Sequence, residues 1–254
     1  MVAALLLVAG PLQADVFGQS PATPGEAKHD AAPREGDAHH RGFFGQLGRD
    51  YAHFVSPSNL VVLGAGGLAA LGAHPYDRRL TDNFRNSERL DSFFEIGDVA
   101  GGGLVQGGVA LGTLLVGRLA HSPKLAQLGG DLVGAQIVSG TVTLGVKLAV
   151  GRDRPDGTRL SFPSGHTSAS FATATVLERH FGWKVGVPAY ALATYIGASR
   201  LQENKHFASD VLFGAAVGIA AGRAVTFDHG RKCVSLTPLV VPGGVGIALV
   251  GVGH

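Results

Sequence analysis

The sequence predicts an all-α protein, a bundle of six helices followed by a short C-terminal β-hairpin. Six apolar stretches dominated by Ala, Gly, Val and Leu are too long for ordinary strands. Glycine accounts for 39 of 254 residues, and charged residues make up 16%, against roughly 25% in ordinary soluble domains. Gly214, Gly218 and Gly222 recur at every fourth position, which places them on one helical face and suits close contact between helices.

Composition divides the chain into four segments. Residues 1–14 resemble the apolar core of an export signal but lack its usual basic start, so an incomplete N-terminus is the alternative. Residues 15–56, rich in Pro, Gly, Ala, Asp and His, are expected to form a mobile leader. We expect the helical domain over residues 57–228 and a C-terminal extension over residues 229–254.

Within the helical domain, residues 75–91 carry charges of both signs, which predict a surface segment. In the C-terminal extension, β-branched runs around Pro242, Gly243 and Gly244 are typical of a hairpin. The six helices are expected at about 59–73, 93–119, 124–150, 167–181, 185–198 and 206–225.

The relation to a membrane stays open. A spanning helix needs about 20 mostly apolar residues, and only residues 99–117 approach this without a charge. An integral inner-membrane protein and a soluble or peripheral periplasmic protein therefore fit almost equally. A cleaved signal would also place the N-terminus outside, which conflicts with a six-span bundle whose site faces outward.

Net charge and cysteine content limit the kinds of partner, disulfide and metal site that the chain can have. A net charge of +2, with no basic run interleaved with aromatics, argues against nucleic acid as a partner. The single cysteine, Cys233, leaves no intrachain disulfide and no cysteine metal cluster. The sequence leaves the oligomeric state undetermined.

Three fixed cations lie at predicted helix ends. Lys147 stands seven positions before Arg154 at the end of the third helix, and Arg200 ends the fifth. Such cations stabilise the negative charge of a phosphoryl transition state, and arginine adds bidentate geometry. The alternative for any one of them is an ordinary side chain that reaches from a helix end to water.

Two histidines accompany these cations. Ser164 and Gly165 form a turn before the fourth helix, where free backbone N–H groups favour an anion, and His166 follows at its rim. His206 and Asp210 are four residues apart, so on a helix they share one face, and the carboxylate would fix the imidazole tautomer. The alternatives are a plain helix cap at Ser164 and a simple pair at a helix start.

In this order the three motifs resemble the signature of the type 2 phosphatidic acid phosphatase and vanadium haloperoxidase superfamily. The motifs are Lys147-x6-Arg154-Pro155, Pro163-Ser164-Gly165-His166 and Ser199-Arg200-x5-His206-x3-Asp210. The resemblance covers about residues 59–225 and implies the six-helix bundle of that superfamily. It does not cover the leader or the hairpin.

The resemblance also implies roles for these residues. His206 is the nucleophile that forms a phosphohistidine, Asp210 orients it, and His166 is the general acid. No metal or other cofactor is expected. The phosphoryl oxygens are bound by Lys147, Arg154, Arg200, Ser164 and Gly165.

The resemblance implies a metal-independent phosphatase. The signal-like N-terminus leads us to expect it in the cell envelope, with its site on the extracytoplasmic side of the inner membrane or in the periplasm. We expect a phosphate monoester or pyrophosphate ester as substrate, and the apolar bundle favours a lipid-linked one. The alternatives are a soluble periplasmic acid phosphatase or phosphotransferase and, more remotely, a vanadium-dependent haloperoxidase. His206 must be neutral to attack and His166 must be protonated to donate. We therefore expect a bell-shaped dependence of the rate on pH, with the highest rate at mildly acidic to neutral pH.

Overall fold

The computed structural model describes residues 43–85, 88–227, 233–241 and 244–252. The expected export signal at residues 1–14 and most of the expected leader lie outside these ranges. The helices are α1 (Phe43–Phe54), α2 (Pro57–Ala73), the 3-10 helix η1 (His74–Tyr76), α3 (Asp77–Arg85), α4 (Glu88–Gly101), α5 (Gly103–Leu119), α6 (Pro123–Val150), α7 (Gly165–Phe181), α8 (Trp183–Gln202) and α9 (Ala208–Val225).

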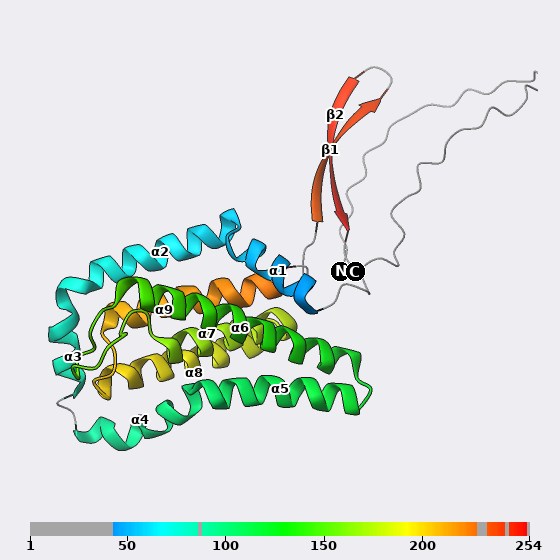
Figure 1. Ribbon diagram of the computed structural model, residues 1–254. Coiled ribbons are helices and arrows are strands. Elements are labelled where there is room, and N and C mark those ends of the chain that lie inside the picture. The colour runs from blue at the N-terminus through cyan, green and yellow to red at the C-terminus, as the bar shows by residue number, and fades with distance from the viewer. Residues whose placement is uncertain (1–42, 86–87, 228–232, 242–243, 253–254) are drawn as a thin grey trace, which may run out of the picture. The chain divides into compact units, whose positions relative to one another are not determined.

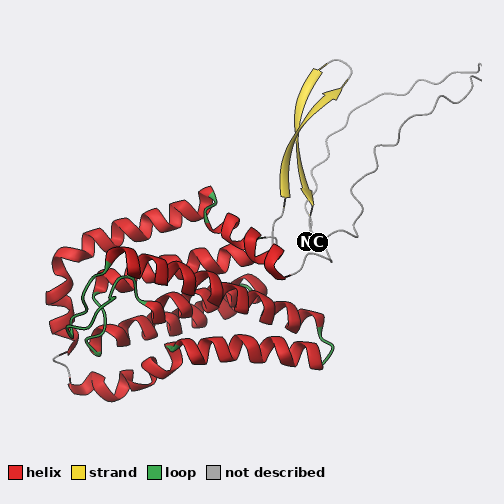
Figure 2. Cartoon of the chain, viewed as in Figure 1, coloured by secondary structure: helices red, strands yellow, loops and turns green. Residues whose placement is uncertain are grey.

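The described helices pack as a bundle around α7, which confirms the expected all-α fold (Figures 1 and 2). Helix α7 contacts α6, α8 and α9, whereas α5 packs on α6 and α2 packs on α9. Helix α4 packs along α8. The long loop between α6 and α7 and the shorter one between α8 and α9 lie at the same end of the bundle as α3 (Figure 2).

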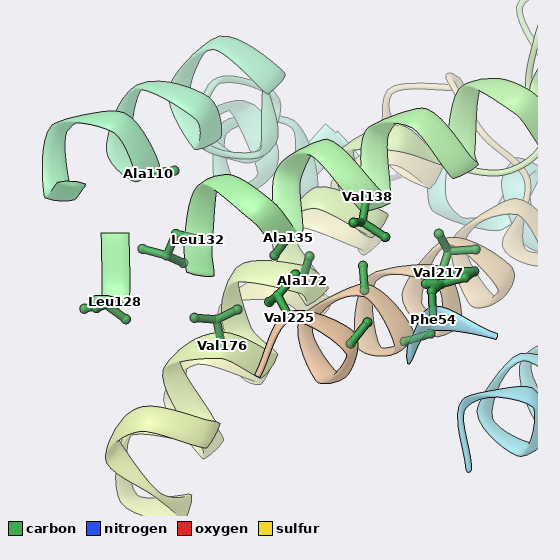
Figure 3. Packing of buried hydrophobic residues seen from close by; sticks show 13 residues of the cluster. Phe54, Ala110, Leu128, Leu132, Ala135, Val138, Ala172, Val176, Val217 and Val225 are labelled. Carbon is green, nitrogen blue, oxygen red and sulfur yellow. The ribbon is translucent and has the colours of Figure 1, made fainter. Parts of the chain in front are cut away.

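Small side chains fill the centre of the bundle (Figure 3). Ala135 and Val138 of α6 meet Ala172 of α7 and Val217 of α9, and each of these four side chains is fully buried. Because these side chains are short, the helix axes can approach closely while the interior stays well packed.

The glycine face of α9 lies against α7, as the spacing of its glycines predicts. A methyl group at Gly218 would overlap with the carbonyl oxygen of Ser168, and one at Gly214 would lie 2.7 Å from that of Ser164. A methyl group at Gly222 would lie 2.5 Å from Thr175 Cβ. The two helices therefore pack backbone to backbone.

One expectation for residues 75–119 is wrong. The stretch 93–119 is two helices, because Gly102 takes an extended conformation (φ −61°, ψ 139°) between α4 and α5. The expected surface segment at 75–91 contains η1, α3 and the start of α4, and most of its residues with a described burial are exposed. Helix α3 begins at the buried Asp77, whose Oδ1 accepts a hydrogen bond from the Ser209 backbone N–H at 2.9 Å.

The expectation of a mobile leader up to residue 56 is wrong from residue 43 onward, because residues 43–54 form the helix α1. Phe54 belongs to the hydrophobic core, and Leu47 and Tyr51 pack against it, so one face of α1 is apolar. At the other end, strands β1 (Cys233–Val241) and β2 (Gly244–Val252) pair antiparallel, with Val241 opposite Gly244. Residues 242–243 of the expected turn lie outside the described ranges.

Among the described helices, α6 and α9 are long and apolar enough to cross a membrane. A third span is possible if residues 44–54 and 57–83, which meet at a bend of 58°, act as one. Large apolar side chains also face outward on α2 and α5: Leu104 is 94% exposed, and Val61, Leu68, Leu115 and Leu119 are exposed as well.

We expect Gly218→Ala to destabilise the protein by about 1–3 kcal/mol, because the added methyl group has no room against α7. Gly145→Ala in α6 is the matched control, since a methyl group there meets no atom within 4 Å. That substitution should be neutral or stabilise by up to about 1 kcal/mol. Denaturant unfolding of both variants measures the difference, and equal effects would show that α7 and α9 are not closely packed.

Candidate active site

The structure brings all eight predicted site residues to one end of the bundle. The helices α6 to α9 run alternately up and down, so the end of α6, the start of α7, the end of α8 and the start of α9 meet there. Lys147 and Arg200 lie in the last turns of α6 and α8. Gly165, His166 and Asp210 lie in first turns, Ser164 caps α7, and Arg154 and His206 lie in the connecting loops.

His206 is buried in the loop before α9, with 3% of its surface exposed. The expectation that it opens the helix is wrong, because the helix begins at Ala208 after the extended N-cap residue Phe207. Its Nδ1 atom nevertheless lies 3.5 Å from Asp210 Oδ2, a contact longer than an ordinary hydrogen bond. Its backbone N–H donates to the Arg200 carbonyl oxygen at 3.1 Å.

Burial lowers the pKa of His206 to about 4, and the nearby Lys147 and Arg154 charges act in the same direction. The contact with Asp210 opposes this shift. His206 is therefore neutral over the ordinary pH range, the state in which an imidazole nitrogen has a lone pair for attack.

The Asp210 carboxylate is fully buried and accepts hydrogen bonds from several segments. Its Oδ2 atom accepts from the Ser161 hydroxyl and from the Phe207 backbone N–H at 2.9 Å. Its Oδ1 atom accepts from Arg152 Nη1 at 2.9 Å. Its backbone carbonyl accepts from the Ser164 N–H at 3.0 Å, which joins the starts of α7 and α9.

Lys147 and Arg154 flank the histidines from the α6–α7 side. Lys147 Nζ donates to the carbonyl oxygens of Leu160 and Ser161, which ties the loop back onto α6. Arg154 Nε is buried and has no hydrogen-bond partner within the described part of the chain. The Arg154 charge contributes to the lowered pKa of both histidines, after burial, so the guanidinium lies within electrostatic reach of both.

The first turn of α7 carries Ser164, Gly165 and His166. The Ser164 hydroxyl oxygen accepts from the Thr167 hydroxyl at 2.9 Å and from its backbone N–H at 3.4 Å, so Ser164 caps the helix. The first N–H groups of a helix have no partner within it, which favours a bound anion. His166 Nε2 lies 3.2 Å from Asp98 Oδ1.

Sequence reasoning missed Asp98, which contacts two of the predicted site residues. Besides approaching His166, its Oδ1 atom accepts from Arg200 Nη1 at 2.6 Å, while Nη2 of Arg200 pairs with Glu203. Burial and the Arg200 charge lower the pKa of His166, and the Asp98 carboxylate opposes them. The available signal was one acid between Gly97 and Gly101 in an otherwise apolar stretch.

Those two glycines let α4 approach the site. A methyl group at Gly97 would overlap with the Ser199 hydroxyl, and one at Gly101 would overlap with Ile196 and lie 3.2 Å from His166 Cδ2. Asp98, between them, keeps a side chain that is 56% exposed. The carboxylate is therefore accessible to water while it touches His166.

Sequence reasoning also missed Arg152, two residues before Arg154. Its guanidinium joins Asp210 to Asp77, with Nη1 2.9 Å from Asp210 Oδ1 and Nη2 2.8 Å from Asp77 Oδ2. The same group lies 4.2 Å from the centre of the Phe207 ring. A cavity of about 400 Å³ beside it is lined by His74, Pro75, Asp77, Arg78, Arg152, Asp153 and Phe207.

No group of three or more His, Cys, Asp or Glu side chains that could hold a metal ion occurs among the residues with described positions. The groups gathered at the site are instead imidazoles, cations and hydrogen-bonded carboxylates. These can bind an anion, supply a nitrogen nucleophile and transfer a proton.

Comparison with known proteins finds similarity within the helical domain. Residues 128–232 match the sequence model of the PAP2 superfamily. The chain is 46% identical over 99 residues to the lipid A 1-phosphatase of Porphyromonas gingivalis, a match covering 37% of this chain and 22% of that protein. It is 27% identical over 136 residues to the lipid A 4'-phosphatase of Helicobacter pylori, covering 49% of this chain and 69% of that protein.

The fold is similar to that of the crystal structure of Aquifex aeolicus LpxE. The TM-score is 0.51 at 24% sequence identity, and the match covers 59% of this chain and 94% of that one. This likeness supports the helical fold. The match to the P. gingivalis relative spans about a fifth of that protein's length, so activity and substrate are proposals for this chain.

Proposed function

We propose that this protein is a metal-independent phosphatase that cleaves a phosphate monoester or pyrophosphate ester through a phosphohistidine on His206. The observation that carries the proposal is the environment of His206. A buried imidazole whose pKa is lowered to about 4 lies 3.5 Å from a carboxylate that is itself held by several donors. The match of residues 128–232 to the PAP2 superfamily model supports the same chemistry.

In the first step, His206 Nε2 attacks phosphorus as the bond to the leaving oxygen breaks. The His166 imidazolium gives its proton to that oxygen. In the second step, His166 takes a proton from water as the water oxygen bonds to phosphorus, and the nitrogen–phosphorus bond breaks. Asp210 faces Nδ1 of His206 and stabilises the positive charge that develops on the ring. Contacts of this kind are often long without substrate and shorten when it binds.

Fixed positive charge stabilises the transferring phosphoryl group. Arg154 has a buried Nε without a partner among the described residues, and Lys147 has a third N–H beyond its two contacts with carbonyls. Arg200, Ser164 and the Gly165 N–H complete the proposed cradle. Negative charge on the equatorial oxygens is stabilised more strongly in such a buried site than in water. Asp98 keeps a negative charge beside His166 and so favours its protonated form.

We propose a lipid-linked phosphate as substrate and a membrane location with the site on the extracytoplasmic side. Two of the relatives bear the names lipid A 1-phosphatase and lipid A 4'-phosphatase. Two described helices are long enough to span a membrane, and exposed apolar side chains on α2 and α5 suit contact with acyl chains. A lipid substrate in that setting can reach the site from the bilayer.

Membrane fractions of cells that express the full chain test this location. We expect the protein to stay with the membrane through high-salt and alkaline washes, and phosphate release to be faster from phosphatidic acid in mixed micelles than from p-nitrophenyl phosphate. Release into the wash, with equal rates on both substrates, would instead indicate a soluble acid phosphatase.

His206→Ala should abolish phosphate release, because it removes the proposed nucleophile. We expect a loss of at least about 10³-fold, with thermal unfolding close to that of the unchanged protein. Rapid acid-free quenching with a ³²P-labelled substrate should trap an alkali-stable, acid-labile phosphoenzyme only when His206 is present. Chelators should not change the rate. Activity in His206→Ala, or halide oxidation with vanadate in place of phosphate release, would exclude this mechanism.

The pH–rate profile should be bell-shaped. Protonation of His206, whose pKa is about 4 in the free enzyme, removes the nucleophile, so kcat/KM should fall below that pH. Deprotonation of His166, whose pKa lies below the usual 6.5, removes the acid, so kcat/KM should already fall as pH rises toward neutrality. A bound phosphoryl group favours charged His166, which should move the basic limb of kcat to higher pH. A rate that still climbs above about pH 9 would contradict these assignments.

A further inference from the structure

We propose that Arg152 is a positioning residue that, anchored by Asp77, sets the orientation of the Asp210 carboxylate and through it the His206 ring. This inference rests on the proposed function, because it concerns the same nucleophile. Arg152 lies inside the first motif, Lys147-x6-Arg154-Pro155, but at one of its unspecified positions. It acts from the far side of Asp210, where it does not contact His206.

Arg152 binds one oxygen of Asp210 and leaves the other to His206. Nη1 of Arg152 donates to Oδ1 at 2.9 Å. Oδ2 faces His206 Nδ1 at 3.5 Å and accepts from the Ser161 hydroxyl and the Phe207 backbone N–H. With Oδ1 fixed, the carboxylate cannot rotate about its Cβ–Cγ bond without breaking a charged hydrogen bond.

The position of Arg152 is itself fixed on three sides. Nη2 donates to Asp77 Oδ2 at 2.8 Å, and Nη1 also donates to the Ser209 hydroxyl at 2.7 Å. The face of the guanidinium covers the Phe207 ring at 4.2 Å. A planar guanidinium can hold two carboxylates and an aromatic face at once, which a lysine ammonium cannot do.

Asp77 ties this arrangement to α9. Its two oxygens accept from the Ser209 backbone N–H at 2.9 Å and the Ser209 hydroxyl at 2.6 Å. Asp77 is also 3.2 Å from His74 Nδ1. The start of α3, the α6–α7 loop and the first turn of α9 are therefore joined next to the residue that faces His206.

The charge of Arg152 also bears on the titration of His206. Among the described residues, the cations next to His206 and Asp210 are Lys147 from α6 and Arg152 and Arg154 from the α6–α7 loop. Arg200 of α8 meets His206 through its backbone carbonyl, while its guanidinium pairs with Asp98 and Glu203. Asp77 of α3 lies behind Arg152. Loss of Arg152 removes the cation that balances Asp210, so the carboxylate favours protonated His206 more strongly. His206 should then titrate at higher pH.

Arg152→Ala tests the proposal against Arg159→Ala, which removes an exposed arginine from the same loop. With p-nitrophenyl phosphate we expect Arg152→Ala to lower kcat about tenfold to a hundredfold. Competitive inhibition by inorganic phosphate should stay unchanged, because Arg152 does not hold the phosphoryl oxygens. The acid limb of kcat/KM should move to higher pH, whereas Arg159→Ala should behave as the unchanged protein. Arg152→Lys, which keeps the charge, should restore the limb but only part of kcat.

The ¹⁵N NMR titration of His206 gives a readout that needs no turnover. The resonance is identified by its loss in His206→Ala, and its midpoint should rise in Arg152→Ala. Thermal melts check folding; if Arg152→Ala does not fold, Arg152→Lys and Asp77→Asn carry the test, each with the expected fall in kcat.

Three results would overturn the proposal. One is a kcat for these variants equal to that of Arg159→Ala. Another is weaker phosphate inhibition with kcat unchanged, which would make Arg152 a substrate-binding group at the neighbouring cavity. The third is an unmoved His206 midpoint in folded Arg152→Ala. Absence of phosphate release from the unchanged protein would instead overturn the proposed function, while the titration would still report on Arg152.

Discussion

The Asp210 carboxylate is fully buried at the first turn of α9, and a buried carboxylate stays charged only where donors surround it. Here the donors come from different parts of the chain: Ser161 and Arg152 from the α6–α7 loop, and the N-cap residue Phe207. The backbone carbonyl of the same residue accepts from Ser164 at the start of α7. Removing this carboxylate would leave several buried donors unpaired at once, so the geometry of the whole site depends on it.

The close packing of α7 and α9 makes that arrangement possible. Gly214 and Gly218 bring the α9 backbone against Ser164 and Ser168 of α7. Because both helices begin at the site, their separation sets the distance between the segments that carry His166 and His206. The small side chains between α7 and α9 therefore set the spacing of His166 and His206, although most of these side chains lie far from the two histidines.

Local patterns predicted most of the helices and pointed to eight candidate residues that the structure gathers at one end of the bundle, because helices and motifs both leave regular spacing in the sequence. The glycine face of α9 and the ordered motifs from Lys147 to Asp210 are of this kind. Arg152, Asp77 and Asp98 were missed because their roles depend on contacts between residues far apart in the chain, such as Arg200 with Asp98. The segment 75–91 is largely exposed, as its charges predict, and the burial of Asp77 within it depends on Ser209 in α9.

The extended conformation of Gly102 divides one apolar stretch between two tasks. Helix α5 packs on α6, while α4 packs along α8. A single straight helix could not make both contacts. Asp98 belongs to α4, the helix that packs along α8, and lies next to Arg200 and His166. The register of α4 is thus independent of the length of α5. Insertions or deletions beyond Gly102 can change how far α5 extends along the bundle without moving the carboxylate that faces the proposed acid.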